Sequence, residues 1–231
     1  MRSIRAGLIA LALAGFVTMA ASAQQSTQDN VATLSENLKT SMAELKHYEW
    51  IETSVISLKG EEKGKKQNRC YYDAEGKLTK VATGGGTEGG KKRGLRGRAA
   101  ASKKEEIAAS MERAVALVHA YLPPDPARIQ AARGEGRLSV RPPDNQGRAG
   151  LDIRDYLKPG DLLTVEMDAN TNRILKVAVS SYSTAKDKDP VDFVADFNAL
   201  PDGTIHVATT TFNLKSEGTT VKVDNSGYRK I

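Results

Sequence analysis

The chain has 231 residues, a formal net charge of +6, and 39% hydrophobic and 27% charged residues. The length suits one large domain or two small ones, and the composition is that of an ordinary globular chain rather than a disordered one. Cys70 is the single cysteine, so the chain cannot form an internal disulfide and packing must stabilise its fold.

The first 23 residues have the pattern of a secretory signal peptide. Arg2 and Arg5 precede an uncharged apolar run over residues 6–20, and Ala21-Ser22-Ala23 is a small-x-small cleavage motif. The run is shorter than the roughly 20 residues that a membrane span requires. We therefore expect cleavage after Ala23 and a periplasmic protein, with secretion as the alternative.

That destination excludes several functional classes. The periplasm offers no ATP, no reduced nicotinamide and no chromosomal DNA, so we expect no nucleotide, no nucleic acid and no cofactor. Residues 84–89 fit G-x-G-x-x-G and residues 85–91 fit most of a P-loop. Lys92 stands where a P-loop needs Ser or Thr, and a glycine-rich composition explains both matches.

A polar leader over residues 24–30 precedes an amphipathic helix, which is predicted over residues 31–46. Its apolar side chains recur at helical spacing: Val31, Leu34, Leu38, Met42 and Leu45. β-Branched and aromatic residues over 48–58 then predict a strand. A polar turn is expected over residues 61–66, around Gly60 and Gly64, followed by a returning strand over 68–72.

A short strand is expected over residues 78–83. Residues 84–98 are rich in glycine, lysine and arginine without periodicity, which predicts a flexible loop. A second helix is predicted over residues 107–122, because apolar residues again recur at helical spacing until Pro123-Pro124-Asp125-Pro126 ends it. A short helical turn is expected over residues 126–132.

The remainder of the chain predicts strands. Their expected ranges are 138–140, 151–156, 162–167, 174–180, 191–197, 204–212 and 219–228. Short turns join most of them, which favours antiparallel pairing because parallel pairs need a crossover of about a dozen residues or more. The predicted class is therefore α+β: a large antiparallel sheet with about two helices covering one face, in a single domain over residues 31–231.

No catalytic or metal-binding pattern stands out. Asp168, Asn170 and Asn172 resemble the opening of a calcium loop, but Arg173 replaces the glycine that such a loop needs, so a hairpin turn explains them better. The three histidines lie far apart in the sequence and lack the spacing of zinc ligands. We therefore expect a protein that is not an enzyme and holds no metal.

Positive charge is concentrated in one region. Residues 59–104 carry 14 Lys or Arg and 5 Asp or Glu, and five of these cations lie in the glycine-rich loop: Lys91, Lys92, Arg93, Arg96 and Arg98. One interpretation is contact with an anionic membrane surface or headgroup. The alternative is a solvated loop that its lysines keep soluble.

Several of these features together resemble the LolA-like periplasmic lipoprotein carriers, including the LolB-like and RseB-like domains. They are the export signal, the amphipathic helix, the Tyr48-x-Trp50 strand, the Asp168-x-x-Thr171-x-Arg173 hairpin and Leu200-Pro201-Asp202-Gly203-Thr204. The resemblance would cover most of residues 31–228. The basic glycine-rich insertion and the proline-rich break depart from the family.

The resemblance implies a strongly curved antiparallel sheet, an incomplete barrel, whose helices close over an apolar cavity. It implies binding of a lipid, an acyl chain or a lipid-modified partner, and Trp50, Ile51, Val55 and Ile56 are the candidate cavity lining. The alternative is a protein–protein interaction module of a cell-envelope assembly, without a small ligand. The sequence predicts no particular oligomeric state.

Overall fold

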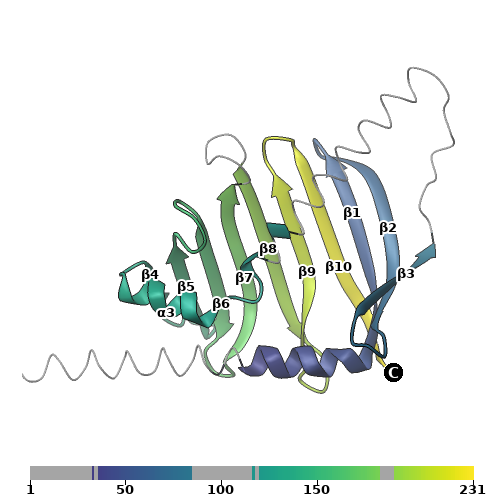
Figure 1. Ribbon diagram of the computed structural model, residues 1–231, viewed down its shortest axis with the longest axis horizontal. Coiled ribbons are helices and arrows are strands. Elements are labelled where there is room, and N and C mark those ends of the chain that lie inside the picture. Colours follow the sequence, from purple (N-terminus) through teal and green to yellow (C-terminus); the bar gives the residue numbers. More distant parts are fainter. Residues whose placement is uncertain (1–32, 34–35, 85–115, 118–119, 183–189) are drawn as a thin grey trace, which may run out of the picture.

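The described part of the computed structural model is dominated by one antiparallel sheet (Figure 1). It describes residues 33, 36–84, 116–117, 120–182 and 190–231. The ten strands are β1 (Tyr48–Leu58), β2 (Glu61–Tyr72), β3 (Leu78–Gly84), β4 (Leu138–Arg141), β5 (Arg148–Arg154), β6 (Leu162–Asp168), β7 (Arg173–Tyr182), β8 (Pro190–Ala199), β9 (Ile205–Leu214) and β10 (Thr219–Lys230).

The strand order follows from two meanders that meet at the chain's last strand. Strands β4 to β10 pair in sequence, and β1 pairs with the far side of β10 before β2 and β3 continue outward. The two ends of the sheet, β3 and β4, do not pair with each other, so the sheet stays open. This confirms the predicted α+β class with a curved antiparallel sheet and few helices.

Helical segments lie against one side of the sheet. Residues 36–44 are helical and continue into the short 3-10 helix η1 (Leu45–His47), and this helix runs across the ends of β7 to β10 (Figure 1). The second segment is α3 (Pro126–Gly134), which confirms the expected helical turn there. Among the described residues, no helix is long and apolar enough to cross a membrane.

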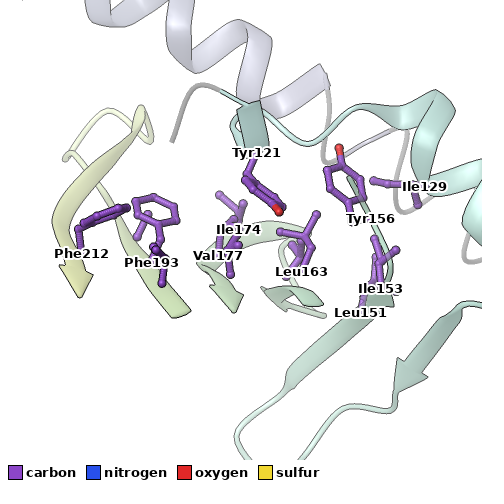
Figure 2. Close-up of a cluster of buried hydrophobic side chains, with 14 of the residues drawn as sticks. Tyr121, Ile129, Leu151, Ile153, Tyr156, Leu163, Ile174, Val177, Phe193 and Phe212 are labelled. Carbon is purple, nitrogen blue, oxygen red and sulfur yellow. The ribbon is translucent and has the colours of Figure 1, made fainter. Parts of the chain in front are cut away.

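The core lies on the sheet face beneath these helices (Figure 2). Alternate residues of each strand point to the same face, and in β6 this places Leu163, Val165 and Met167 inside. Phe193 of β8 and Phe212 of β9 are cross-strand partners, and both are at most 3% exposed. Aromatic pairs of this kind contribute both buried area and cross-strand packing.

The opposite face is polar and joined by cross-strand ion pairs. Arg141 of β4 lies 3.0 Å from Asp152 of β5 and 3.6 Å from Glu166 of β6. Further along the sheet, Lys176 lies 3.5 Å from Asp196. Because this face carries the charges, an apolar ligand has to be sought on the core side.

One turn is shorter than predicted. Residues 61–66 form the first half of β2, and the turn is made by Lys59 and the predicted Gly60, with φ of 52° and 83°. Two successive residues with positive φ make the tight hairpin turn that suits the twist of antiparallel strands. The turn after Asp168 is confirmed, since its carboxylate accepts a 2.9 Å hydrogen bond from Asn170 N.

Several predictions fall on residues outside the described ranges. These are the signal peptide and the polar leader, all but Gly84 of the glycine-rich loop with both of its motif matches, and most of the second helix. Residues 116, 117 and 120–122 of that helix are described: 116, 117, 120 and 121 are helical, and residue 122 lies in a bend after the helix.

Candidate functional site

An apolar groove opens between the first helix and the core face of the sheet. It consists of two adjoining cavities, of about 370 and 260 Å³. Four residues line both cavities: Leu38 and Met42 from the helix, and Pro123 and Pro124 from the segment that crosses the sheet. The shared lining makes the two cavities a single groove.

The floor of the groove is formed by strand residues on the core face. Leu151 and Val165 line one cavity, while Ile174, Phe197 and Ile205 line the other. The remaining lining residues are Lys39, Leu45, Leu122, Asp125, Pro126, Ile129 and Val207. Apart from Lys39 and Asp125, this lining consists of residues with apolar side chains, which is typical of small-molecule sites.

The sequence positions the helix wall by its spacing. Leu38 and Met42 are one turn apart, so they project from the same side of the helix. Leu38 packs against the core, whereas Met42 remains 52% exposed at the groove. The unbranched side chain of Met42 therefore gives the groove a flexible apolar wall.

Pro123 and Pro124 form one wall of the groove, here called the proline wall, and hydrogen bonds hold its end at Asp125. The backbone N–H of Asp125 donates to the hydroxyl of Tyr156, at 2.6 Å, and the Asp125 carboxylate accepts from Ala127 N, at 2.8 Å. The second bond caps the N-terminus of α3. Pro126 has no backbone N–H, and the first position of a helix has no partner for one. The wall therefore continues directly into a fixed helix that carries Ile129 into the groove.

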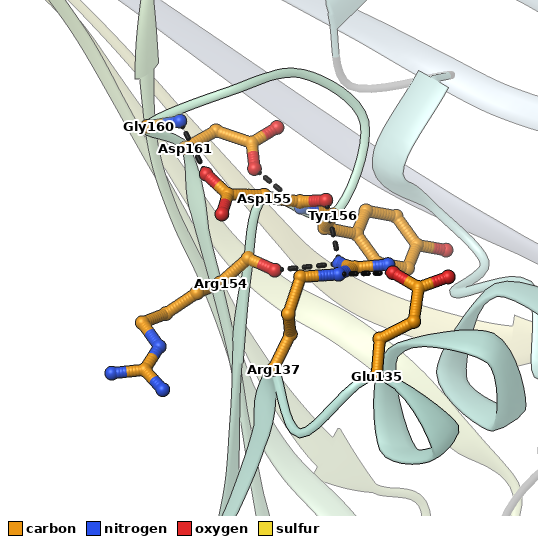
Figure 3. Close-up of polar contacts among 7 residues, drawn as sticks. All are labelled: Glu135, Arg137, Arg154, Asp155, Tyr156, Gly160 and Asp161. Carbon is orange, nitrogen blue, oxygen red and sulfur yellow. Dashed lines mark hydrogen bonds and ion pairs between the residues drawn. The ribbon is translucent and has the colours of Figure 1, made fainter.

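An arginine clamp fixes the other end of α3 to the sheet (Figure 3). The Arg137 guanidinium donates to the carbonyl oxygens of Arg154 and Asp155, each at 2.8 Å, and to Glu135 at 2.7 Å. The planar guanidinium of Arg137 thus donates to three acceptors at once. Together with the cap, this contact sets where α3 stands over β5.

Behind the proline wall lies a buried polar network. Asp161 is 2% exposed, and its carboxylate accepts from three backbone N–H groups, those of Tyr156, Leu157 and Lys158, at 2.6 to 3.1 Å. Tyr121 donates to the same carboxylate at 2.6 Å. Burial, and then the bond to Asp161, raises the pKa of Tyr121, so this hydroxyl stays a donor at neutral pH.

Lys39 supplies the positive charge at the mouth of the groove. Its side chain is 73% exposed and its ammonium lies 4.0 Å from Glu36 on the preceding turn. An exposed pair at this distance is weak, so the ammonium can turn toward an anionic group at the groove. Asp125 at the same cavity is already used by the α3 cap and by Arg128, 3.8 Å away.

Trp50 lies in a separate aromatic cluster on the core side, near the C-terminal strand. Its ring stacks on Tyr228 with centroids 5.6 Å apart, and Tyr228 in turn lies 4.2 Å from His206. The Trp50 indole N–H donates to Asn225, at 3.1 Å. Burial lowers the pKa of His206 and raises that of Tyr228. The described geometry gives Trp50 a packing role.

The other three predicted lining residues divide between the two faces. Ile56 shares the core face with Trp50 and packs against the core, whereas Ile51 and Val55 alternate to the polar face, opposite Arg69 and Lys65. None of the four lines the apolar groove. Ile51 and Val55 therefore point away from the groove, because neighbouring residues of a strand point to opposite faces.

The sequence contained the groove residues without identifying them as a site. Leu38 and Met42 belong to the apolar stripe of the predicted helix, and Pro123 and Pro124 were recognised only as its stop. Lys91, Lys92, Arg93, Arg96 and Arg98 lie outside the described residues. Within the described ranges, no group of three or more His, Cys, Asp or Glu side chains is arranged to hold a metal ion.

Comparisons with known proteins give little further information. No family model matches the chain, and no curated protein matches it. A solved structure of a DUF1329 family protein from Desulfovibrio piger is similar over 89% of this chain and 92% of that one, with 10% identity and a TM-score of 0.39.

Proposed function

We propose that this protein is an exported, non-enzymatic periplasmic protein that binds an acyl chain in the apolar groove. The acyl chain would belong to a lipid or a lipid-modified partner, as the resemblance to LolA-like carriers implies. The observation that carries the proposal is the groove itself: two adjoining cavities of about 370 and 260 Å³ that share Leu38, Met42, Pro123 and Pro124.

The size and lining of the groove support an acyl occupant. Ligand sites in proteins usually measure about 300 to 1,000 Å³ and are largely apolar with a few placed polar groups. Each methylene group that the groove takes from water contributes about 0.8 kcal/mol. Lys39 at the mouth supplies one cation, which suits the carboxylate or phosphate at the head of a lipid.

The experiment is a binding measurement with a groove variant and a matched control. The full chain is purified gently, examined by native mass spectrometry for bound lipid, and titrated with a fluorescent fatty acid. Met42→Glu places a carboxylate at the groove on a side chain that is already half exposed. Ala43→Glu makes the same charge change on the same helix at an exposed residue outside the lining.

We expect the Met42→Glu variant to bind the fatty acid at least about tenfold more weakly, because a carboxylate in an apolar site loses its hydration. The Ala43→Glu variant should bind like the parent protein. Absence of lipid and of fatty-acid uptake in the parent protein would overturn the proposal. That result would favour the alternative, a protein–protein interaction module without a small ligand.

A further inference from the structure

A further cavity lies on the core face at the other end of the sheet, over β1, β2 and β3. Its volume is about 300 Å³. The lining residues are Glu52, Ser54, Ile56, Gly64, Lys65, Lys66, Asn68 and Lys80. Among the described residues, none lines both this cavity and the apolar groove. It is a separate place with a polar lining.

The charges around this cavity do not balance. Three lysines and one glutamate line it. The Lys80 ammonium reaches from β3 across β2 to Glu52 on β1, at 2.6 Å, and Asn68 donates to the other Glu52 oxygen at 3.2 Å. Glu52 is only 14% exposed, and these two contacts satisfy its carboxylate. The lysines that remain therefore give the cavity a positive potential.

Lys66 is the cation that is left for a ligand on this face, because Lys65 pairs with Val55 and alternates to the polar face. Lys66 lies directly across from Ser54 in the β1–β2 pairing, on the same face as Glu52. In the described part of the chain, the Lys66 side chain makes no ion pair and no hydrogen bond. An ammonium and a hydroxyl thus stand side by side at the cavity, and both can donate to an anion.

Gly64 keeps the cavity open, and it lies beside a shift of register in the β1–β2 pairing. It lies within β2 opposite Ile56, and its φ is not among the positive values of the chain. A Cβ added at this position would meet nothing within 4 Å. Glycine weakens a strand interior and often marks a bulge or a place where a ligand comes close to the backbone.

From this arrangement we propose that the β1–β3 cavity binds a phosphate group, through the Lys66 ammonium and the Ser54 hydroxyl. Lysine binds phosphate as a point charge, and a hydroxyl adds a directed hydrogen bond. The cavity has room for atoms attached to the phosphate. The group can therefore belong to a soluble phosphate ester or to a phospholipid headgroup.

Two variants and one control test the site. Lys66→Gln removes the unpaired cation, and Gly64→Val fills the cavity without touching any charge. Lys77→Gln makes the same charge change at an exposed residue of the β2–β3 turn that does not line the cavity. Calorimetric titration of the full chain with glycerol phosphate tests the soluble source, and flotation with phosphatidic acid in phosphatidylcholine vesicles tests the lipid source.

We expect the parent protein and Lys77→Gln to bind in at least one arm. Lys66→Gln should bind about tenfold more weakly, and Gly64→Val should not bind. Valine favours strands, so Gly64→Val should fold with an unchanged or raised melting temperature and keep its fatty-acid binding. No binding in either arm overturns the site, as does equal binding by Gly64→Val or equal weakening by Lys77→Gln.

Discussion

The hydroxyl of Tyr121 donates a 2.6 Å hydrogen bond to Asp161, which lies 40 residues further along the chain in the loop before β6. Tyr121 is 1% exposed and immediately precedes the segment that forms the proline wall. Its ring also lies 5.8 Å from that of Tyr156, whose hydroxyl accepts from Asp125 N. Both ends of the wall are therefore tied to the same buried carboxylate loop.

Replacing Tyr121 by phenylalanine should lower the free energy of unfolding and leave the fold unchanged. Tyr121→Phe removes the hydroxyl from a buried carboxylate and from Ser181 Oγ, 2.9 Å away. We expect the free energy of unfolding to fall by about 1–3 kcal/mol, because buried polar groups are left with an unfilled hydrogen bond. Urea denaturation followed by circular dichroism measures the change.

The control is a tyrosine whose hydroxyl bonds at the surface. Tyr182 donates to the Pro159 carbonyl oxygen, at 3.1 Å, in an exposed contact. Tyr182→Phe should change the free energy of unfolding by no more than about 0.5 kcal/mol. Equal losses in the two variants would contradict the role we assign to the Asp161 network.

The hairpin turn at Lys59 and Gly60 offers a stabilising change. Lys59 has a φ of 52°, a left-handed conformation that costs a residue with an ordinary side chain roughly 1–2 kcal/mol. Asparagine adopts it more easily, and Asn-Gly is the preferred pair for this turn. Lys59→Asn should therefore raise the free energy of unfolding by about 0.5–1 kcal/mol.

The same denaturation experiment can test the direction of this effect. Gly60, with a φ of 83°, should tolerate alanine poorly, so Gly60→Ala is expected to lower the free energy of unfolding by about 1 kcal/mol. An increase from Gly60→Ala, or a decrease from Lys59→Asn, would mean that the turn geometry is not what limits stability.

Strand β2 shows what sequence patterns could and could not predict. Strand β1 was predicted with its observed bounds, because its β-branched and aromatic residues have a high strand propensity. The first half of β2 is charged, contains Gly64 and is mostly exposed, so neither alternation nor propensity marks it. It forms a strand because the Lys59–Gly60 turn brings it beside β1 and it pairs with β1. Such pairing is not visible in the local sequence of β2.

The candidate site shows the same division. The apolar stripe with Leu38 and Met42 was visible as periodicity, since a helix buries one face regardless of its partner. Which part of that stripe stays uncovered depends on where Pro123 and Pro124 cross the sheet. That crossing depends on Asp161, Tyr121 and Tyr156, which meet only in the folded chain. A groove is a property of the gap between elements, so no single segment encodes it.

His206 should make stability depend on pH in the neutral to weakly acidic range. Burial lowers its pKa from the ordinary 6.5, while the hydrogen bond with the Val207 carbonyl opposes part of that shift. Between the unfolded and folded pKa values the unfolded chain binds more protons. Stability is therefore fully present above about pH 6.5 and is lost as pH falls toward the folded pKa.

The variant His206→Gln isolates this contribution, because glutamine keeps polar atoms but does not titrate. We expect the free energy of unfolding of the parent protein to fall between about pH 7.5 and pH 5 by more than that of the variant. Denaturation series at matched ionic strength give the comparison. Parallel pH profiles for the two proteins would show that His206 is equally protonated in both states.

Lys39 should select the head of the ligand and leave its chain unaffected. Its ammonium lies at the mouth of the groove and is 73% exposed, so its attraction for a carboxylate is screened by water. Exposed ion pairs contribute roughly 0.2–1 kcal/mol, and Lys39→Gln should therefore weaken fatty-acid binding about two- to fivefold. Binding of the fatty alcohol of the same chain length should not change. Competition with a fluorescent fatty acid measures both affinities, and their ratio tests the role of Lys39 separately from the groove. Weaker binding of both ligands would mean that Lys39 stabilises the fold. Unchanged binding of both would mean that the headgroup lies elsewhere.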